Sequence, residues 1–462
     1  MHPPNAAPRF AAEARATAVL AAPLVAGHLA TGLIGFVDAA IAGHHGTATL
    51  AAVAVGAALY ALPMMVPMGT LMALPPAVSQ LDGAGRRADI GPLFRQALWL
   101  ALALGIGMFA FMTLAGHALG PMGIAADVRP GARDFLHGIR WGAPALTLYL
   151  AMRYLSDGLH WSLPTMLFGF GGLVVLVPLG YMFTFGYDGL PGVRIPEMGA
   201  GGLGLASAVM LWAQALSFAL YLARSRRFAP LALFSHFERP KRAPVVALLR
   251  NGLPIGVTVA MEGGLFIVTA LLIGRLGALP VAAHQIAINV SALCFMVPFG
   301  LAEATTVRVG HARGRGSADG VRRAAMAGYA LALLTQACSA LVLLAGNDLL
   351  VSLYTRDAAA AALAASLLLY AAAFQFPDGI QVVSAGALRG LGDTRVPMFL
   401  AALAYWGVGM PLGAGLGLGL GWGPKGMWIG LIAGLGVAAV LLGWRFLRAS
   451  ARPLPAGGAN AA

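Results

Sequence analysis

Three acidic residues lie where this sequence holds almost no other charge, which makes them the best candidates for chemistry. Each stands alone in a long uncharged stretch: Asp38 within residues 16–81, Glu262 within 251–274, and Asp378 within 358–388. An isolated carboxylate inside a membrane-length apolar stretch is costly, so such residues usually face a cavity or a partner and have a function there. We therefore predict that these acids handle an ion or a substrate.

The chemistry open to such carboxylates is the binding and release of cations. A carboxylate in a mostly apolar cavity can take up a proton or attract an organic cation. It can also hold a sodium ion together with backbone carbonyls. Pro377, beside Asp378, frees one such carbonyl by removing a helical hydrogen bond. Gly263 and Gly264, which directly follow Glu262, are further sources of such carbonyls. A site that holds either an inorganic cation or a cationic substrate, but not both, produces antiport.

The elements that must position these acids are membrane-spanning helices. The chain has 462 residues, of which 59% are hydrophobic and 10% charged, with mean hydropathy +0.80, whereas soluble domains carry about 25% charge. Apolar windows of about 20 residues predict twelve spans, at residues 16–42, 49–75, 93–116, 135–154, 163–187, 200–223, 247–273, 280–305, 322–346, 359–385, 394–420 and 425–446. The fold class is thus an all-α polytopic membrane protein.

The basic residues predict how this protein lies in its membrane. Of the 30 Lys and Arg residues, 23 fall on the loops that follow even-numbered spans or on the two termini. The positive-inside rule then places both termini in the cytoplasm. The net charge of +13 is a topology signal and does not indicate nucleic-acid binding. The N-terminus shows no pattern of a cleaved signal peptide, so we expect the first span to serve as the insertion signal.

The sequence repeats itself once. A shift of 231 residues aligns Pro23 with Pro254 and Pro67 with Pro298, and MVPMG (65–69) with MVPFG (296–300). A shift of 233 aligns three further prolines with their counterparts: Pro144 with Pro377, Pro164 with Pro397, and Pro178 with Pro411. We predict two six-helix bundles, residues 1–235 and 236–462, related by a pseudo-two-fold axis along the membrane normal. A cavity between such halves is typical of an alternating-access carrier.

The three acids do not follow this repeat. Each aligns with a neutral residue: Glu262 with Thr31, Asp378 with Ala145, and Asp38 with Thr269. Requirements of folding would act on both halves alike, so unpaired acids indicate chemistry placed on a duplicated scaffold. Asp38 lies nearer the outer end of its span than the other two.

Few other residues compete for a functional role. His284 and Gln285 lie within the eighth span and are candidates to line the cavity, and Phe295 offers either a cation–π face or core packing. The glycine run at residues 415–421 is expected to pack helices. No phosphate-binding GxxxxGK[ST] loop is present, so we predict that no ATPase drives the protein. The prediction is of no enzyme and no cofactor.

Several motifs resemble the multidrug and toxic compound extrusion (MATE) family, in its NorM-like bacterial branch. They are PDGIQVVSAGALRGLGDTRVP (377–397), VAAHQIAINVSALCFMVPFGLAEATTVRVG (281–310) and GLHWSLPTM (158–166). The resemblance covers about residues 15–450. It implies a polyspecific exporter of organic cations in a bacterial inner membrane, driven by inward flow of Na⁺ or H⁺ through alternating opening of a V-shaped cleft.

The resemblance also implies roles for particular residues. Acids of the seventh and tenth helices form the cation site in this branch and match Glu262 and Asp378, and Asp38 matches an implicated first-helix acid. Asp357 matches a position that contacts drugs in some relatives, and Gln285 a substrate-cavity position.

Two departures from the family pattern bear on the coupling ion. Leu176 and Gly180 flank Pro178 where many relatives carry asparagines, and Phe295 replaces an aromatic hydroxyl that helps to hold sodium in some relatives. These departures favour a working site in the second half and weaken the case for sodium there. The choice between Na⁺ and H⁺ therefore stays open.

Two other classes of function fit the sequence less well. A lipid-linked precursor flippase of the same superfamily should need cationic residues in its cavity to hold a pyrophosphate, and the sequence places no Lys or Arg in mid-span. A membrane receptor or scaffold would not require unpaired deep acids. We therefore expect a monomeric exporter, whose partners are cationic amphipathic small molecules and the lipid bilayer.

Overall fold

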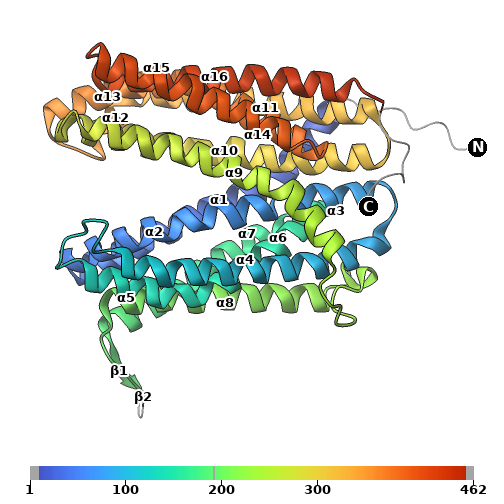
Figure 1. The fold of residues 1–462 in the computed structure, drawn as a ribbon, viewed down its shortest axis with the longest axis horizontal. Helices are drawn as coiled ribbons and strands as arrows, with labels where there is room; N and C mark the ends of the chain where they lie inside the picture. Colours follow the sequence, from blue (N-terminus) through green and yellow to red (C-terminus); the bar gives the residue numbers. More distant parts are fainter. Residues whose placement is uncertain (1–9, 191–192, 454–462) are drawn as a thin grey trace, which may run out of the picture. The chain divides into compact units, whose positions relative to one another are not determined.

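The computed structural model describes residues 10–190 and 193–453, and almost all of them are helical (Figure 1). The α-helices are α1 (Phe10–His45), α2 (Thr47–Leu71), α3 (Leu74–Gly83), α4 (Ile90–Ala118), α5 (Arg129–Ile139), α6 (Ala143–Gly158), α7 (Leu163–Phe185), α8 (Gly199–Arg224), α9 (Arg242–Gly274), α10 (Ala278–Gly314), α11 (Ala318–Ala345), α12 (Asn347–Ser352), α13 (Ala358–Gly390), α14 (Arg395–Ala402), α15 (Met410–Ala414) and α16 (Gly423–Ser450). The all-α class is confirmed.

Short irregular elements complete the chain. Three are 3₁₀ turns, η1 (Arg87–Asp89), η2 (Arg140–Gly142) and η3 (Ala229–Leu231), and two are π-helical, η4 (Leu403–Gly409) and η5 (Gly415–Gly419). Strands β1 (Tyr187–Leu190) and β2 (Val193–Ile195) pair antiparallel between α7 and α8. Neither the π-helical turns nor the hairpin was expected from hydropathy, since that pattern reports only apolar length.

The number of spans can be compared with the twelve predicted. In the described part of the chain, ten helices are long and apolar enough to cross a membrane, or eleven if the bent pair Thr47–Ala61 and Pro63–Gly83 is one span. The remaining predicted span, 135–154, falls on α5, η2 and α6, which together run from Arg129 to Gly158. Charged residues such as Asp134 and Arg140 lower the hydropathy of this segment, although its backbone is helical almost throughout.

The described residues form two compact units. The C-terminal unit contains residues 10–25, 79–85 and 257–453, and the N-terminal unit contains 26–78, 86–190 and 193–256. Each unit therefore includes the beginning of the first helix of the other sequence half, α1 or α9. The predicted boundary at residue 235 separates the two sequence repeats. The compact units differ from the repeats, because the start of α1 belongs to the C-terminal unit and the start of α9 to the N-terminal unit.

Glycine contacts show where the exchanged helix starts are packed. In the N-terminal unit, a Cβ atom on Gly69 of α2 would lie 2.5 Å from the Cα of Gly256 at the start of α9. In the C-terminal unit, a Cβ on Gly300 of α10 would lie 2.6 Å from a side-chain methyl of Val25 in α1. The repeat shift of 231 aligns Gly69 with Gly300 and Val25 with Gly256. The two units thus use the same contact twice, with the partners exchanged.

The core of the C-terminal unit is built from α10, α11, α13 and α16. Their apolar residues enclose buried aromatic side chains, including Tyr405 and Trp428, and the Phe374 ring lies 5.8 Å from Trp428. Helices that are apolar on nearly all sides are typical of membrane spans, because lipid and protein both accept such surfaces.

A row of glycines brings α16 against the segment η4–α15–η5. The facing residues are Gly409 with Gly434, Gly413 with Gly430, and Gly417 with Gly426. A Cβ on Gly430 would lie 2.6 Å from the carbonyl oxygen of Gly409, so no larger residue fits without separating the backbones. Small residues at regular spacing allow such close approach in membranes. The packing role predicted for the glycine run is confirmed at Gly417.

The N-terminal unit contains a buried polar cluster around Asp157 of α6. Its Oδ1 accepts a hydrogen bond from Thr165 at 2.6 Å, and its Oδ2 lies 3.4 Å from Nε of Arg153. Arg153 also contacts Nε2 of His28 at 3.3 Å. Both charged side chains are under 10% exposed, at 7% and 3%. Removing one member of such a buried ion pair leaves an uncompensated charge in the protein interior, which is strongly destabilising.

We therefore expect Asp157→Ala to destabilise the protein by about 3–5 kcal/mol, because it removes a carboxylate from a buried guanidinium. Thermal unfolding of the purified protein in detergent measures this. The double substitution Arg153→Met with Asp157→Leu removes both charges together and should cost less than the single change. A single variant that melts like the unsubstituted protein would contradict this account of the cluster.

The predicted linker between the halves is fastened to α4. Glu238 accepts from Nε of Arg95 at 2.9 Å and pairs with Lys241 at 2.6 Å, and its backbone carbonyl accepts from the indole of Trp99 at 2.8 Å. Hydrogen bonds from Lys241 and Arg95 lower the pKa of the Glu238 carboxyl. The residues before α9 are therefore held against the N-terminal unit, which is where the start of α9 is packed.

Candidate cation-coupling site

Helix α13 carries a ladder of buried polar residues through the C-terminal unit. Gln375, Asp378, Gln381 and Ser384 follow one another at intervals of three residues, and each is 2% exposed or less. Residues three apart on a helix lie on neighbouring turns of nearly the same face. Polar groups buried in a membrane segment require partners, so the neighbours of this ladder define the site.

Gln381 joins two other elements to α13. Its Nε2 donates a hydrogen bond to Oε1 of Glu262 on α9 at 2.8 Å. Its Oε1 accepts a hydrogen bond from the Tyr405 hydroxyl, in the π-helical segment η4, at 2.9 Å. Three elements far apart in the sequence thus meet at one amide, with Glu262 half-buried and Tyr405 fully buried.

Asp378 lies beside this group. It is 2% exposed and interacts electrostatically with Glu262 and Gln381. Its Oδ1 has no hydrogen-bond partner among the residues that the structure describes. Two neighbouring carboxylates repel each other when both are ionised, and a proton or a metal cation between them removes that repulsion. The structure therefore brings Glu262 and Asp378 together, as their isolation in the sequence suggested, in an arrangement that can bind a cation.

The two ends of the ladder are held by α11. The Gln336 amide donates to the Gln375 carbonyl at 2.8 Å and to its side-chain oxygen at 3.0 Å. The Ser384 hydroxyl pairs with the Tyr329 hydroxyl at 2.8 Å. These bonds join α13 to α11, and none of them is to Glu262 or Gln381.

Asp38 belongs to the N-terminal unit. It lies on α1, half-buried, and interacts electrostatically with Tyr60 of α2 and Ser207 of α8. Within the described residues its Oδ1 has no hydrogen-bond partner. Asp38 is therefore the third of the predicted acids, with neutral oxygen-bearing neighbours, in a different unit from Glu262 and Asp378.

The residues predicted to line a substrate cavity lie in different surroundings. His284 on α10 is 2% exposed and packs against Trp428, with ring centroids 6.0 Å apart. Gln285 is exposed and donates to the Asn289 side chain at 2.9 Å. A core position for His284 and an open position for Gln285 are expected for adjacent helical residues, which point to different sides.

Phe295 and Asp357 both contact other residues of the protein in ways that serve its structure. The Phe295 ring stacks on Phe299 at 5.5 Å and packs against the core cluster of α1, α10 and α13. Asp357 is the N-cap of α13, where its Oδ1 accepts from the backbone N–H of Ala360 at 2.7 Å. Contact of these two residues with a substrate stays a prediction.

Sequence reasoning missed Gln381 and Tyr405. Gln381 could have been found, because it follows Asp378 by three residues on a predicted helix and is polar in an apolar span. Tyr405 gave no comparable signal. Its direction depends on the π-helical turn, in which each residue is rotated from its ordinary α-helical position.

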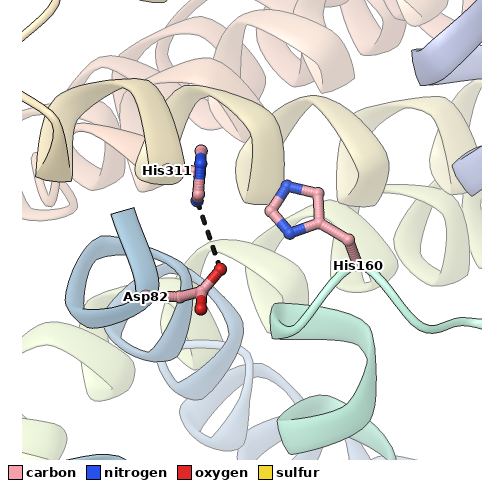
Figure 2. A group of neighbouring side chains, drawn as sticks. All are labelled: Asp82, His160 and His311. Atoms are coloured by element: carbon pink, nitrogen blue, oxygen red, sulfur yellow. Dashed lines mark ion pairs between the residues drawn. The ribbon is translucent and has the colours of Figure 1, made fainter. Parts of the chain in front are cut away.

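Another ion pair ties segment 79–85 to α10 in the C-terminal unit. The Asp82 carboxylate lies 3.4 Å from Nδ1 of His311 (Figure 2). Nearby, the Gln80 side chain donates to the carbonyl of Gly390, at the end of α13, at 2.9 Å. This short segment therefore contacts α10 and the end of α13, the helix that carries the ladder, and it contributes no residue to the group of Glu262 and Asp378.

The fold and the buried acids define an all-helical membrane transporter, and comparisons with known proteins agree. The family model described as MatE matches the chain twice, over residues 23–182 and 254–414. The chain therefore belongs to the MatE family, the multidrug and toxic compound extrusion family predicted from its motifs, and it is not an enzyme. The starts of the two matches differ by 231 residues, which confirms the internal repeat.

Named relatives cover nearly the whole chain. A "Probable multidrug resistance protein NorM" of Xanthomonas campestris pv. campestris is 68% identical over 456 residues, which is 99% of this chain and 98% of that protein. "Multidrug resistance protein PmpM" of Pseudomonas aeruginosa is 41% identical over 450 residues, with 96% and 93% covered. The NorM-like resemblance is therefore confirmed.

Solved structures share the fold at low identity. The eukaryotic MATE transporter AtDTX14 superposes with a TM-score of 0.83 at 19% identity, covering 96% of this chain and 98% of that one. The Vibrio cholerae MATE transporter VcmN in its bent form gives a TM-score of 0.82 at 17% identity, with 96% and 98% covered. The fold is thus the two-lobed fold of twelve spans that the repeat predicted.

Proposed function

We propose that this protein is a multidrug efflux antiporter, which exports cationic amphipathic small molecules in exchange for inward Na⁺ or H⁺. The observation that carries the proposal is the group of Glu262, Gln381 and Asp378, in which the carboxylates of two membrane helices interact with each other and with one amide. The names of the relatives, which describe multidrug resistance, support the direction and breadth of transport.

In the proposed cycle, Glu262 and Asp378 receive the driving cation from the outer side. Bound cation lowers the negative charge of the pair, so the site attracts a cationic drug less strongly and the drug leaves outward. After the site opens inward and releases its cation, the two carboxylates are free to attract the next drug molecule. Asp38 would hold a cation in the N-terminal unit during the same cycle.

The proposal of a cationic substrate rests on the sign of the buried charge. The three deep acids lie in spans where the sequence places no Lys or Arg near the centre. A buried carboxylate favours a cation that can replace its lost hydration. A flippase for a lipid pyrophosphate remains the alternative, but its anionic headgroup would be repelled by this set of charges.

The setting of the protein is part of the proposal. We propose a bacterial inner membrane, since the named relatives are bacterial, with both termini in the cytoplasm as the distribution of basic residues indicates. A monomer would suffice for the cycle, because the acids and their partners come from one chain. No cofactor is required beyond the coupling ion.

Efflux from proteoliposomes tests the function and identifies the ion. The protein is reconstituted and loaded with ethidium, a fluorescent organic cation, and either a sodium gradient alone or a proton gradient alone is imposed. We expect one of these gradients to drive efflux, and protein-free liposomes to show none. Efflux that follows neither gradient would overturn the antiport proposal.

A further inference from the structure

The Gln381 amide is engaged at both ends, and this determines what it can do to Glu262. Tyr405 donates to its oxygen, which leaves its Nε2 directed at the Glu262 carboxylate. We propose that Gln381 and Tyr405 are positioning residues that hold Glu262 ionised and oriented for the coupling cation. The inference rests on the proposed function and names residues that adjust its affinity for the ion.

The direction of the two hydrogen bonds supports this role. An amide nitrogen can only donate, and an ionised carboxylate can only accept, so the observed pairing suits the charged form of Glu262. A protonated Glu262 that donated its proton would require the amide to turn over, with Tyr405 then accepting. Hydrogen bonds to a charged partner are about twice as strong as neutral ones. Tyr405 therefore favours the ionised state through Gln381.

The π-helical segment η4 provides the reach that Tyr405 needs. Tyr405 is fully buried, so its hydroxyl must find a partner inside the protein, and Gln381 is that partner. The next residue, Trp406, donates from its indole to the Met261 carbonyl at 3.3 Å, immediately before Glu262. Isolated π-helical turns often occur at functional sites. Segment η4 thus contacts both α9 and α13 beside the acids.

Tyr405 and Gln381 form a hydrogen-bonded relay to Glu262, and few charged groups among the described residues interact with it. Asp378 interacts with Glu262 and with Tyr405, and Arg389, nearer the end of α13, interacts with Glu262. A neutral donor such as Gln381 stabilises the charged carboxylate without competing with the coupling cation as a second cation would.

Tyr405→Phe and Gln381→Leu test the relay through the concentration dependence of the driving ion. With sodium as the ion, we expect the half-saturating concentration to rise roughly tenfold in Gln381→Leu, which loses the hydrogen bond to the charged Glu262. The rise should be smaller in Tyr405→Phe, because Tyr405 acts on Glu262 only through the amide. With protons as the ion, the half-saturating proton concentration should instead fall by a similar factor, because the charged form has lost its stabiliser. The maximal efflux rate should change much less than either.

Two matched variants separate this role from a general effect of polarity in the core. Tyr329→Phe removes a hydroxyl bonded to Ser384, and Gln336→Leu removes an amide bonded to Gln375, both at other rungs of the ladder. Neither should move the half-saturating ion concentration. The double variant Gln381→Leu with Tyr405→Phe should have the same half-saturating ion concentration as Gln381→Leu alone, because the tyrosine acts through the amide.

The outcomes distinguish the relay from the antiport itself. If Glu262→Gln keeps ion-driven ethidium efflux, the proposed function fails. If Glu262→Gln is inactive while Tyr405→Phe and Gln381→Leu leave the half-saturating concentration where Tyr329→Phe leaves it, only the relay is overturned. Each variant is first checked for a single peak in size-exclusion chromatography, and Gln381→Met replaces Gln381→Leu if the latter does not fold.

Discussion

Asp378→Asn and Glu262→Gln are each expected to reduce ion-driven efflux to the level of protein-free liposomes. Both changes keep the size of the side chain and remove the charge that binds the cation. In Glu262→Gln the side-chain oxygen can still accept from Gln381, so the contact seen at 2.8 Å need not be lost. Gradient-driven efflux of ethidium from proteoliposomes measures the effect.

The loss should come from coupling and not from misfolding. Melting temperature in detergent should therefore stay the same or rise, since a neutral side chain costs less to bury than a carboxylate. Asp319→Asn is a suitable control, because Asp319 is an exposed acid in the first turn of α11. Efflux at the unsubstituted rate from both Asp378→Asn and Glu262→Gln would remove these residues from the coupling site.

Gly430→Leu is expected to prevent stable folding of the C-terminal unit. A Cβ at this position would already lie 2.6 Å from the Gly409 carbonyl and still closer to the backbone of Gly413. Overpacking usually costs about 1–3 kcal/mol, and more where backbones must move apart. We expect a loss of roughly 3 kcal/mol or more, seen as aggregated protein or a strongly lowered melting temperature in fluorescence-detected chromatography.

Gly436→Leu is the matched control on the same helix. A Cβ on Gly436 would meet no heavy atom within 4 Å, so a leucine there should leave the melting temperature nearly unchanged. Because both substitutions replace a glycine of α16 by the same residue, their helix propensities change alike. Equal melting temperatures for the two variants would show that the glycine row does not control this packing.

Hydropathy and repetition predicted most of the fold. Apolar windows located the spans because lipid imposes a minimum length on every crossing helix, and paired prolines such as Pro67 and Pro298 revealed the duplication. The charged segment around Arg140 is the span that hydropathy describes least well. The exchange of the α1 and α9 starts could not be read from the sequence, because hydropathy does not show which helices are neighbours.

The residues of the candidate site were also predicted only in part. Isolation in an uncharged span singled out Glu262 and Asp378, and the structure brings them together. Of their neutral partners, Gln381 does carry a signal in the sequence, because it is polar and follows Asp378 by three residues, whereas a tyrosine such as Tyr405 in a span gives none. The hydroxyl of Tyr405 reaches Gln381 from a π-helical segment, which no periodicity of 3.6 residues would place there.

The exchanged helix starts also concern the ancestry of the chain. Because Gly69 meets Gly256 and Gly300 meets Val25, a single repeat could make this contact only with a second copy of itself. An ancestor of one repeat would thus have been a symmetric dimer that swapped its first helix, the isologous arrangement of two-fold assemblies. Fusion of the two copies would preserve that swap and allow each copy to diverge. Such divergence accounts for acids that only one half carries: Glu262 and Asp378 without counterparts at 31 and 145, and Asp38 without one at 269.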